Sequence, residues 1–172
     1  MKNFQAYPIS PAALIGPILG MGEVFSLGKM QFMSDTANTA GQMGSFDFPA
    51  LGMVQAMTND INFDFIAPTF GLYCGHGGKI NWLVMGTKLY DGDDFMDIIE
   101  VPVIARVTGI ISGFDPGAFG KGKMQKGVLS INMTRVEVLE GGVAIVTWGL
   151  GSGEFVMGGK DFNALTRLFL AG

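Results

Sequence analysis

The feature that most constrains the fold of this chain is a two-residue alternation of apolar and polar side chains. It is clearest in two segments, residues 54–65 and 128–139. Successive side chains of a β-strand point to opposite faces of a sheet, whereas a helix repeats every 3.6 residues. Each segment is therefore predicted to be a strand with one face on a core and the other toward water. The polar register comprises Asp60, Asn62, Asp64, Ser130, Asn132 and Thr134.

Further strands are predicted where β-branched and aromatic residues dominate between turn signals. The expected strands cover residues 24–33, 54–65, 80–90, 95–112, 128–139, 143–149 and 154–157. Gly141 and Gly142 favour a tight hairpin turn, and Asp91-Gly92-Asp93-Asp94 favours a second one. Pro102 lacks an N–H group, so it is expected at a sheet edge or a bulge.

The chain has 172 residues, enough for one buried core. Helical signals are few, and only residues 69–74 after Pro68 are expected to form a short helix. The predicted fold class is mainly β: a small antiparallel β-barrel or sandwich with one short flanking α-helix and a long β-hairpin loop. Residues 34–42 are predicted to be a long polar loop.

The N-terminal segment is expected to lie outside this fold. Residues 1–22 are interrupted by prolines and glycines, which disfavour a helix. They are predicted to be an extended N-terminal arm, followed by a single β domain over residues 23–172. The same interruptions argue against a signal peptide and a membrane span, so no membrane insertion by this chain is expected.

The residues that carry enzyme chemistry are sparse. His76 is the one histidine, and its neighbour Cys74 is a poor candidate for a nucleophile pair, because such partners usually meet across a fold. The acidic cluster, Asp91 to Asp97, lacks the terminal Glu of a calcium-binding loop. Neither glycine-rich stretch has phosphate-loop spacing. We therefore expect no enzyme activity, no metal and no cofactor.

Charge is low and slightly acidic. Charged residues make up 15% of the chain, with 11 basic and 15 acidic side chains. Proteins that hold nucleic acid use clustered Lys and Arg, so a tight nucleic-acid binder is excluded. A surface with so little charge favours burial against other subunits.

Several short stretches occur in an order typical of one family. They are Leu27–Met30, then Gly41–Ser45 with the residues Gly-Gln-Met-Gly-Ser, then Phe70–Tyr73, the hairpin Ser130–Gly142, and Gly158–Asp161. Together they resemble the major tail tube protein family of contractile-tailed bacteriophages, which is related in fold to the tube proteins of type VI secretion systems.

The resemblance implies a structural subunit that polymerises as stacked hexameric rings. Four strands per subunit would join around a channel inside a contractile sheath. The implied partners are other copies of the chain, the sheath protein, the tape-measure protein, and the tail tip or baseplate and terminator proteins. DNA, or an effector, would be passing cargo only. The implied location is the virion tail, after assembly in the host cytoplasm.

Two sets of residues are assigned on this basis. The polar register listed above is predicted to face the channel, where neutral and acidic side chains would not hold a polyanion. A one-residue slip exchanges the two faces of a strand, so the sequence leaves open which register faces the lumen. The predicted ring-stacking residues are Ser34, Asp35, Asn38, Gly41, Gln42, Met43 and Gly44.

An alternative from another class remains open. The 12 methionines and 14 phenylalanines could line the cavity of a monomeric β-barrel that binds a small apolar ligand.

Overall fold

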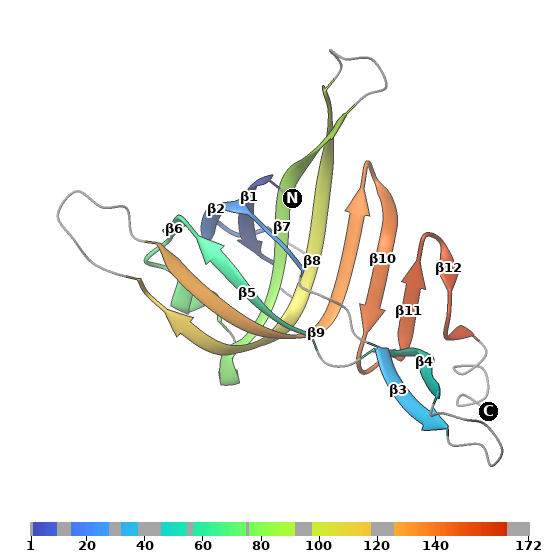
Figure 1. Cartoon of the computed structure of the whole chain (residues 1–172). Coiled ribbons are helices and arrows are strands. Elements are labelled where there is room, and N and C mark those ends of the chain that lie inside the picture. Colours follow the sequence, from blue (N-terminus) through green and yellow to red (C-terminus); the bar gives the residue numbers. More distant parts are fainter. Residues whose placement is uncertain are drawn as a thin grey trace.

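The computed structural model of the chain describes residues 2–9, 15–27, 32–37, 46–54, 57–74, 76–91, 98–117 and 126–164. The strands in these ranges pair in antiparallel fashion (Figure 1), which confirms the predicted mainly β fold class. They are β1 (Lys2–Pro8), β2 (Gly20–Val24), β3 (Phe32–Ala37), β4 (Phe46–Val54), β5 (Met57–Phe63), β6 (Phe65–Ile66), β7 (Lys79–Asp91), β8 (Ile98–Asp115), β9 (Gly127–Glu140), β10 (Val143–Gly149), β11 (Glu154–Met157) and β12 (Lys160–Asp161).

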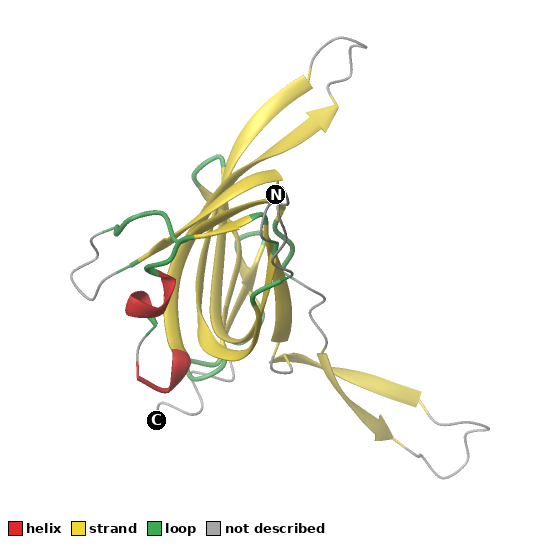
Figure 2. Cartoon of the chain, turned by 90° about the vertical axis from the view of Figure 1, so that its left-hand side faces the viewer, coloured by secondary structure: helices red, strands yellow, loops and turns green. Residues whose placement is uncertain are grey.

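The main sheet curls around an interior. Its hydrogen-bonded path runs β9–β8–β7–β1–β2–β6. β6 follows β5 after a single residue, Asp64, and β5 pairs with the first half of β9. The path therefore returns to β9, and Figures 1 and 2 show the strands wrapping round together. The second half of β9 pairs with β10, so β10, β11 and β12 form an open extension of the sheet.

Aromatic side chains fill the interior. Phe4, Phe63 and Trp82 are buried, and the Phe63 ring lies 5.5 Å from Phe4 and 6.4 Å from Trp82 between centroids. The inward-facing aliphatic residues of β5, β7, β8 and β9 pack with them, among them Ile61, Val84, Val107, Leu129 and Ile131. Since such burial supplies most of the driving force for folding, this cluster determines how the strands wrap.

The N-terminal segment corrects the expectation of an extended arm over residues 1–22. β1 pairs with both β2 and β7, and Phe4 and Leu19 are part of the core. Glycine is needed for this packing, because a Cβ on Gly22 would lie 2.5 Å from the Asn62 carbonyl oxygen. The prediction was wrong because it took these glycines as interruptions, whereas they allow two backbones to approach closely.

Residues 24–42 also differ from the prediction of one strand followed by a long loop. β2 ends at Val24, and residues 25–27 are outside any strand. Ser34 to Ala37, expected in the loop, belong to β3 and pair with β4 as a separate two-stranded sheet. Figures 1 and 2 show this hairpin standing away from the main sheet. Strand propensity depends strongly on the pairing partner, which a local pattern does not contain.

The predicted short helix is present as a 3₁₀ helix, Phe70–Tyr73, rather than as an α-helix. Its amide groups bond three residues back: Phe70 N–H donates to the Ala67 oxygen at 2.9 Å and Leu72 N–H to the Thr69 oxygen at 3.0 Å. A second 3₁₀ turn covers His76–Gly78. Helical segments of three or four residues commonly adopt this tighter bonding pattern.

Two predicted hairpins are confirmed, as β7–β8 and β9–β10. Pro102 lies on β8 just beyond the end of its pairing with β9, which begins at Val103. Its carbonyl accepts a hydrogen bond from Gly141 N–H in the β9–β10 turn, at 3.0 Å. N–H and C=O of one strand residue point to the same side, so the missing N–H of Pro102 faces a turn rather than a strand.

Candidate functional site: a polar face across four strands

The polar register of β5 and β9 lies on the outer face of the curled sheet. Asp60, Asn62 and Asn132 are exposed, and Ser130 is half-buried. The residues between them are buried: Ile61, Phe63, Leu129 and Ile131. The predicted division of these two strands into a core face and a water face is confirmed for these side chains.

Strand register brings the polar side chains of β5 and β9 together in pairs. Asp60 lies opposite Ser130, whose hydroxyl donates a hydrogen bond to the carboxylate. Thr58 lies opposite Asn132, and its hydroxyl donates to the Asn132 Oδ1 at 2.8 Å. Cross-strand pairs of this kind stabilise a sheet and hold the side chains against its surface. Thr58 has the same two-residue spacing as Asp60, so the alternation already contained the signal for it.

The same face continues over β8 and β7. Asn132 lies opposite Ile110, which in turn lies opposite Lys79 on β7. One step along the strands, the Thr108 hydroxyl lies 3.4 Å from the Asn81 side-chain oxygen. The outer face of β5, β9, β8 and β7 is thus one continuous surface of mainly polar side chains.

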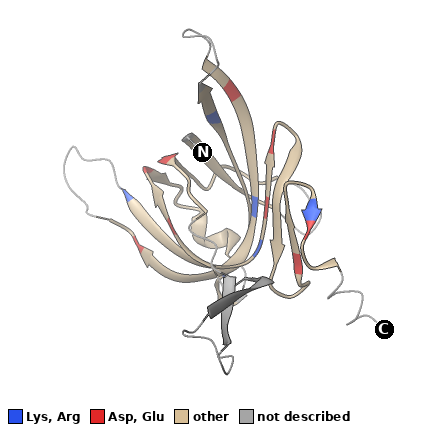
Figure 3. Cartoon of the chain, turned by 45° about the vertical axis from the view of Figure 1, so that its right-hand side comes forward, with Lys and Arg blue, Asp and Glu red and all other residues tan. Residues whose placement is uncertain are grey.

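Two arginines on this face were missed by sequence reasoning. Arg106 on β8 lies opposite Glu137 on β9 with 3.3 Å between Nη1 and Oε2, and Arg135 reaches Glu154 on β11 with 3.7 Å between Nη2 and Oε2. Arg106 follows the alternation of β8, whose inward members Val103, Ala105 and Val107 are buried. Figure 3 shows basic and acidic residues interspersed along the strands rather than gathered in one patch.

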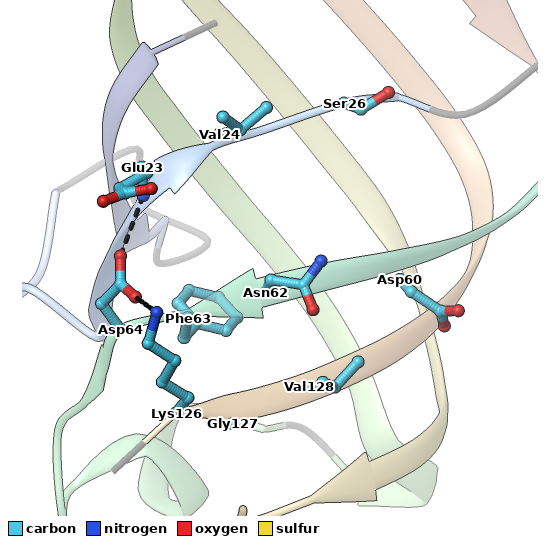
Figure 4. Close-up of a pocket in the computed structure, with 10 residues that line it drawn as sticks. All are labelled: Glu23, Val24, Ser26, Asp60, Asn62, Phe63, Asp64, Lys126, Gly127 and Val128. Carbon is cyan, nitrogen blue, oxygen red and sulfur yellow. Dashed lines mark hydrogen bonds and ion pairs between the residues drawn. The ribbon is translucent and has the colours of Figure 1, made fainter. Parts of the chain in front are cut away.

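Asp64 departs from the predicted register. It interrupts the strand between β5 and β6, and its backbone N–H donates to the Met21 oxygen at 2.9 Å. Its carboxylate accepts a hydrogen bond from Glu23 N–H at 3.1 Å and pairs with the Lys126 ammonium at 3.3 Å. Figure 4 shows these contacts in a groove of about 350 Å³, with Asp60 pointing away from them. Asp64 therefore joins β2 to β5.

Thr134 also departs from the register, because a β-bulge displaces it. Arg135 lies opposite Thr108 and Met133 lies opposite Gly109, which leaves Thr134 without a partner on β8. Its hydroxyl donates to the Thr108 carbonyl oxygen at 3.2 Å. The polar side chain thus compensates for the locally disrupted ladder.

The structure describes two of the predicted ring-stacking residues. Ser34 and Asp35 lie in β3, opposite Pro49 and Phe48 of β4. The other five, Asn38, Gly41, Gln42, Met43 and Gly44, lie outside the described residues.

Cys74 is held in a way that disfavours nucleophilic chemistry. Its thiol lies 3.7 Å from the Phe70 carbonyl oxygen and packs against the core. Burial raises the pKa of the Cys74 thiol, so less thiolate forms at neutral pH. Of the acidic cluster at residues 91–97, Asp93, Asp94 and Asp97 lie outside the described residues. In the described part of the chain, no three His, Cys, Asp or Glu residues are grouped so as to hold a metal ion.

The fold and this face define a class of protein: a β-rich structural subunit that presents a broad sheet surface. Residues 17–170 match the family model described as phage tail tube protein FII, and the chain therefore belongs to the phage tail tube protein family. It is a structural, non-enzymatic subunit of the tail tube and a component of the virion tail. A comparison with curated protein sequences found no match. Among the described residues, no helix has the length and apolar character needed to cross a membrane.

Proposed function

We propose that the chain polymerises into hexameric rings that stack to form the inner tube of a contractile tail. The tube would lie inside a sheath, enclose a tape-measure protein during assembly in the host cytoplasm, and end at tail tip or baseplate and terminator proteins. DNA, or an effector in a tail-like particle, would pass through it. Membership of the tail tube family supports this proposal.

The observation that carries the proposal is the polar outer face of β5, β9, β8 and β7. Its side chains are mainly hydroxyls, amides and paired ions, as with the Asp60–Ser130 hydrogen bond and the Arg106–Glu137 ion pair. Of the described cations on this face, only Lys79 has no ion pair with another described residue. A wall that faces a moving polyanion has to avoid tight phosphate contacts, which arise from unpaired Lys and Arg. We therefore place Asp60, Asn62, Ser130 and Asn132 in the lumen wall.

Two other lumen candidates take supporting roles. Asp64 connects β2 to β5, and Thr134 occupies a bulge beside the face. Both hold the strands of the wall in place, and in this proposal neither contacts the cargo.

Self-assembly is supported by the projecting end of the β7–β8 hairpin. β1 pairs with β7 only as far as Thr87, and β9 pairs with β8 only from Val103 onward. Beyond these points both outer strand edges lack a partner among the described strands. The ribbon also exposes large apolar side chains, Leu89, Tyr90, Ile98 and Ile99. Unpaired edges with exposed apolar residues promote pairing with another chain.

The β3–β4 hairpin is the proposed contact between stacked rings. It hydrogen-bonds to no described strand of the main sheet. An isolated two-stranded hairpin is marginally stable in water, so a neighbouring subunit would supply its missing contacts.

Electron microscopy of the purified protein tests the proposal directly. We expect stacked rings or tubes with an open channel. The alternative, a monomeric barrel for an apolar ligand, would give compact monomers. The packed interior around Phe4, Phe63 and Trp82 favours the first outcome, because side chains occupy the space that such a ligand would need.

The lumen assignment has its own test in Asp60. In particles carrying Asp60→Lys, we expect intact tubes and slower DNA release, since the new cations attract phosphate. Asp60→Asn is the matched control, because it removes the charge without adding a cation, and its release rate should be near normal. Normal release from intact Asp60→Lys particles would contradict the assignment.

A further inference from the structure

The two described arginines of the chain both lie on the outer polar face, and each pairs with a glutamate of another strand. Arg106 and Glu137 are direct cross-strand neighbours, with 3.3 Å between the guanidinium and the carboxylate. The Arg106 side chain is 57% exposed and that of Glu137 is 25% exposed. The cation is thus the more accessible partner, and the carboxylate lies closer to the sheet.

The second pair spans three strands. Arg135 on β9 lies opposite Gly149 on β10, and Gly149 lies opposite Glu154 on β11. Because Gly149 has no side chain, nothing on β10 separates the guanidinium from the carboxylate 3.7 Å away. Arg135 is 58% exposed and Glu154 is 26% exposed, so this pair repeats the arrangement of the first.

Exposed ion pairs of this geometry contribute little to folding stability, because water screens them and two long side chains lose freedom. The ion pairs have a larger effect on the binding of a polyanion. An unpaired guanidinium binds phosphate through two parallel hydrogen bonds, whereas a neighbouring carboxylate competes for the same donors and repels the phosphate. The placement of both glutamates is thus better explained by the exclusion of phosphate groups than by a gain in folding stability.

We propose that Glu137 and Glu154 act as built-in counter-ions that prevent Arg106 and Arg135 on the outer polar face from binding nucleic acid. The ligands that these glutamates exclude are phosphodiester polyanions, and the cations that they neutralise are Arg106 and Arg135. The biological use of this exclusion rests on the proposed function, in which the face borders passing DNA. The exclusion itself is a property of the surface and is measurable without a virion.

The test is the affinity of the full-length protein for a short fluorescent DNA duplex, measured by anisotropy at low salt. We expect the double variant Glu137→Gln, Glu154→Gln to bind about tenfold or more tightly than the unaltered protein, with the gain disappearing as salt rises. Adding Arg106→Gln and Arg135→Gln to this variant should abolish the gain. Thermal unfolding of each variant confirms that it is folded.

Glu140→Gln is the matched control. Glu140 pairs with Lys88 at 3.3 Å, but this pair lies on the other face of the sheet, because Glu140 is opposite the buried Val103. Substitution there removes the same charge and should leave DNA affinity unchanged. An unchanged affinity of the folded double variant, or an equal gain with Glu140→Gln, would overturn the proposal.

These outcomes are separable from those that test the proposed function. Tubes that form while the double variant gains no affinity would overturn only the counter-ion role. A gain in affinity in a protein that forms no tubes would support the counter-ion role and overturn the tube proposal.

Discussion

At the scale of single residues, Gly109 shows how closely β8 approaches β9 in the sheet that carries the polar face. It lies at the β8 bulge beside Thr108, opposite Met133. A Cβ at this position would lie 2.5 Å from the Asn132 carbonyl oxygen and 2.8 Å from the Ile131 side chain. Neither neighbour can move without disturbing β9, so the position requires glycine.

We therefore expect Gly109→Ala to destabilise the unassembled subunit by about 1–3 kcal/mol, the usual cost of overpacking. Urea unfolding followed by circular dichroism measures this change. Gly71→Ala is the control, since a Cβ there meets no atom within 4 Å. Equal stability of the two variants would contradict the packing at Gly109.

At the scale of elements, Asp64 is the joint between β2 and the β5–β6 strand. Its backbone and its carboxylate bond to β2. Its carboxylate also pairs with the side chain of Lys126, which is 76% exposed and directly precedes β9. The hydrogen bond to the Glu23 amide and the exposed ion pair are separable contributions, because substitution of Lys126 removes only the ion pair, whereas Asp64→Ala removes both.

Asp64→Ala should cost about 1–2 kcal/mol of unfolding free energy, because it leaves the Glu23 amide without its acceptor. Lys126→Ala removes only an exposed ion pair and should cost about 0–1 kcal/mol. Asp64→Asn keeps an acceptor oxygen, and its cost in unfolding free energy should lie between those of the other two variants. Chemical denaturation compares the three. If Lys126→Ala cost as much as Asp64→Ala, the ion pair rather than the amide contact would hold the joint.

The β3–β4 hairpin is the second element with a testable role. Deleting residues 35–39 shortens it while leaving every strand of the main sheet intact. We expect a subunit with near-normal unfolding behaviour that forms no tubes in electron micrographs. Tubes of normal length from this deletion would contradict the stacking role.

At the scale of the whole molecule, one group of exposed apolar side chains lies where the β7–β8 hairpin leaves the sheet. Ile98 and Ile99 are 68% and 55% exposed, on opposite faces of the ribbon. Burial of such residues against a second copy is favourable by roughly 25 cal/mol per Å² of apolar area. The low charge of the chain, 15% of its residues, is consistent with a surface that is covered after assembly.

The double variant Ile98→Asp, Ile99→Asp is expected to remain folded and to lose assembly, because exposed positions tolerate charge whereas an interface does not. Sedimentation and microscopy measure assembly, and thermal unfolding measures the fold. Leu72→Asp is the control, since Leu72 is 81% exposed on the 3₁₀ helix, away from the hairpin. Assembly of the double variant at the normal concentration would contradict the role of the ribbon.

The sequence predicted the parts of this protein that depend on local periodicity. The alternation in residues 57–63 and 127–133 determined which side chains of β5 and β9 face the core, and the glycine pair 141–142 determined the β9–β10 turn. Of the stretches that carry the family resemblance, the hairpin Ser130–Gly142 overlaps these segments. These features could be predicted from the sequence because the side chains of a strand alternate between its two faces whatever strand it pairs with.

Only the tertiary structure decided which elements meet. Long-range pairing placed Phe4 in the core, moved Asp64 out of the polar register, and set Arg106 against Glu137 across two strands. Register between distant strands depends on bulges and on close backbone contacts such as that at Gly22, and these are properties of two segments at once. Local pattern therefore determined the faces of the strands, and nonlocal packing determined the site that those faces build.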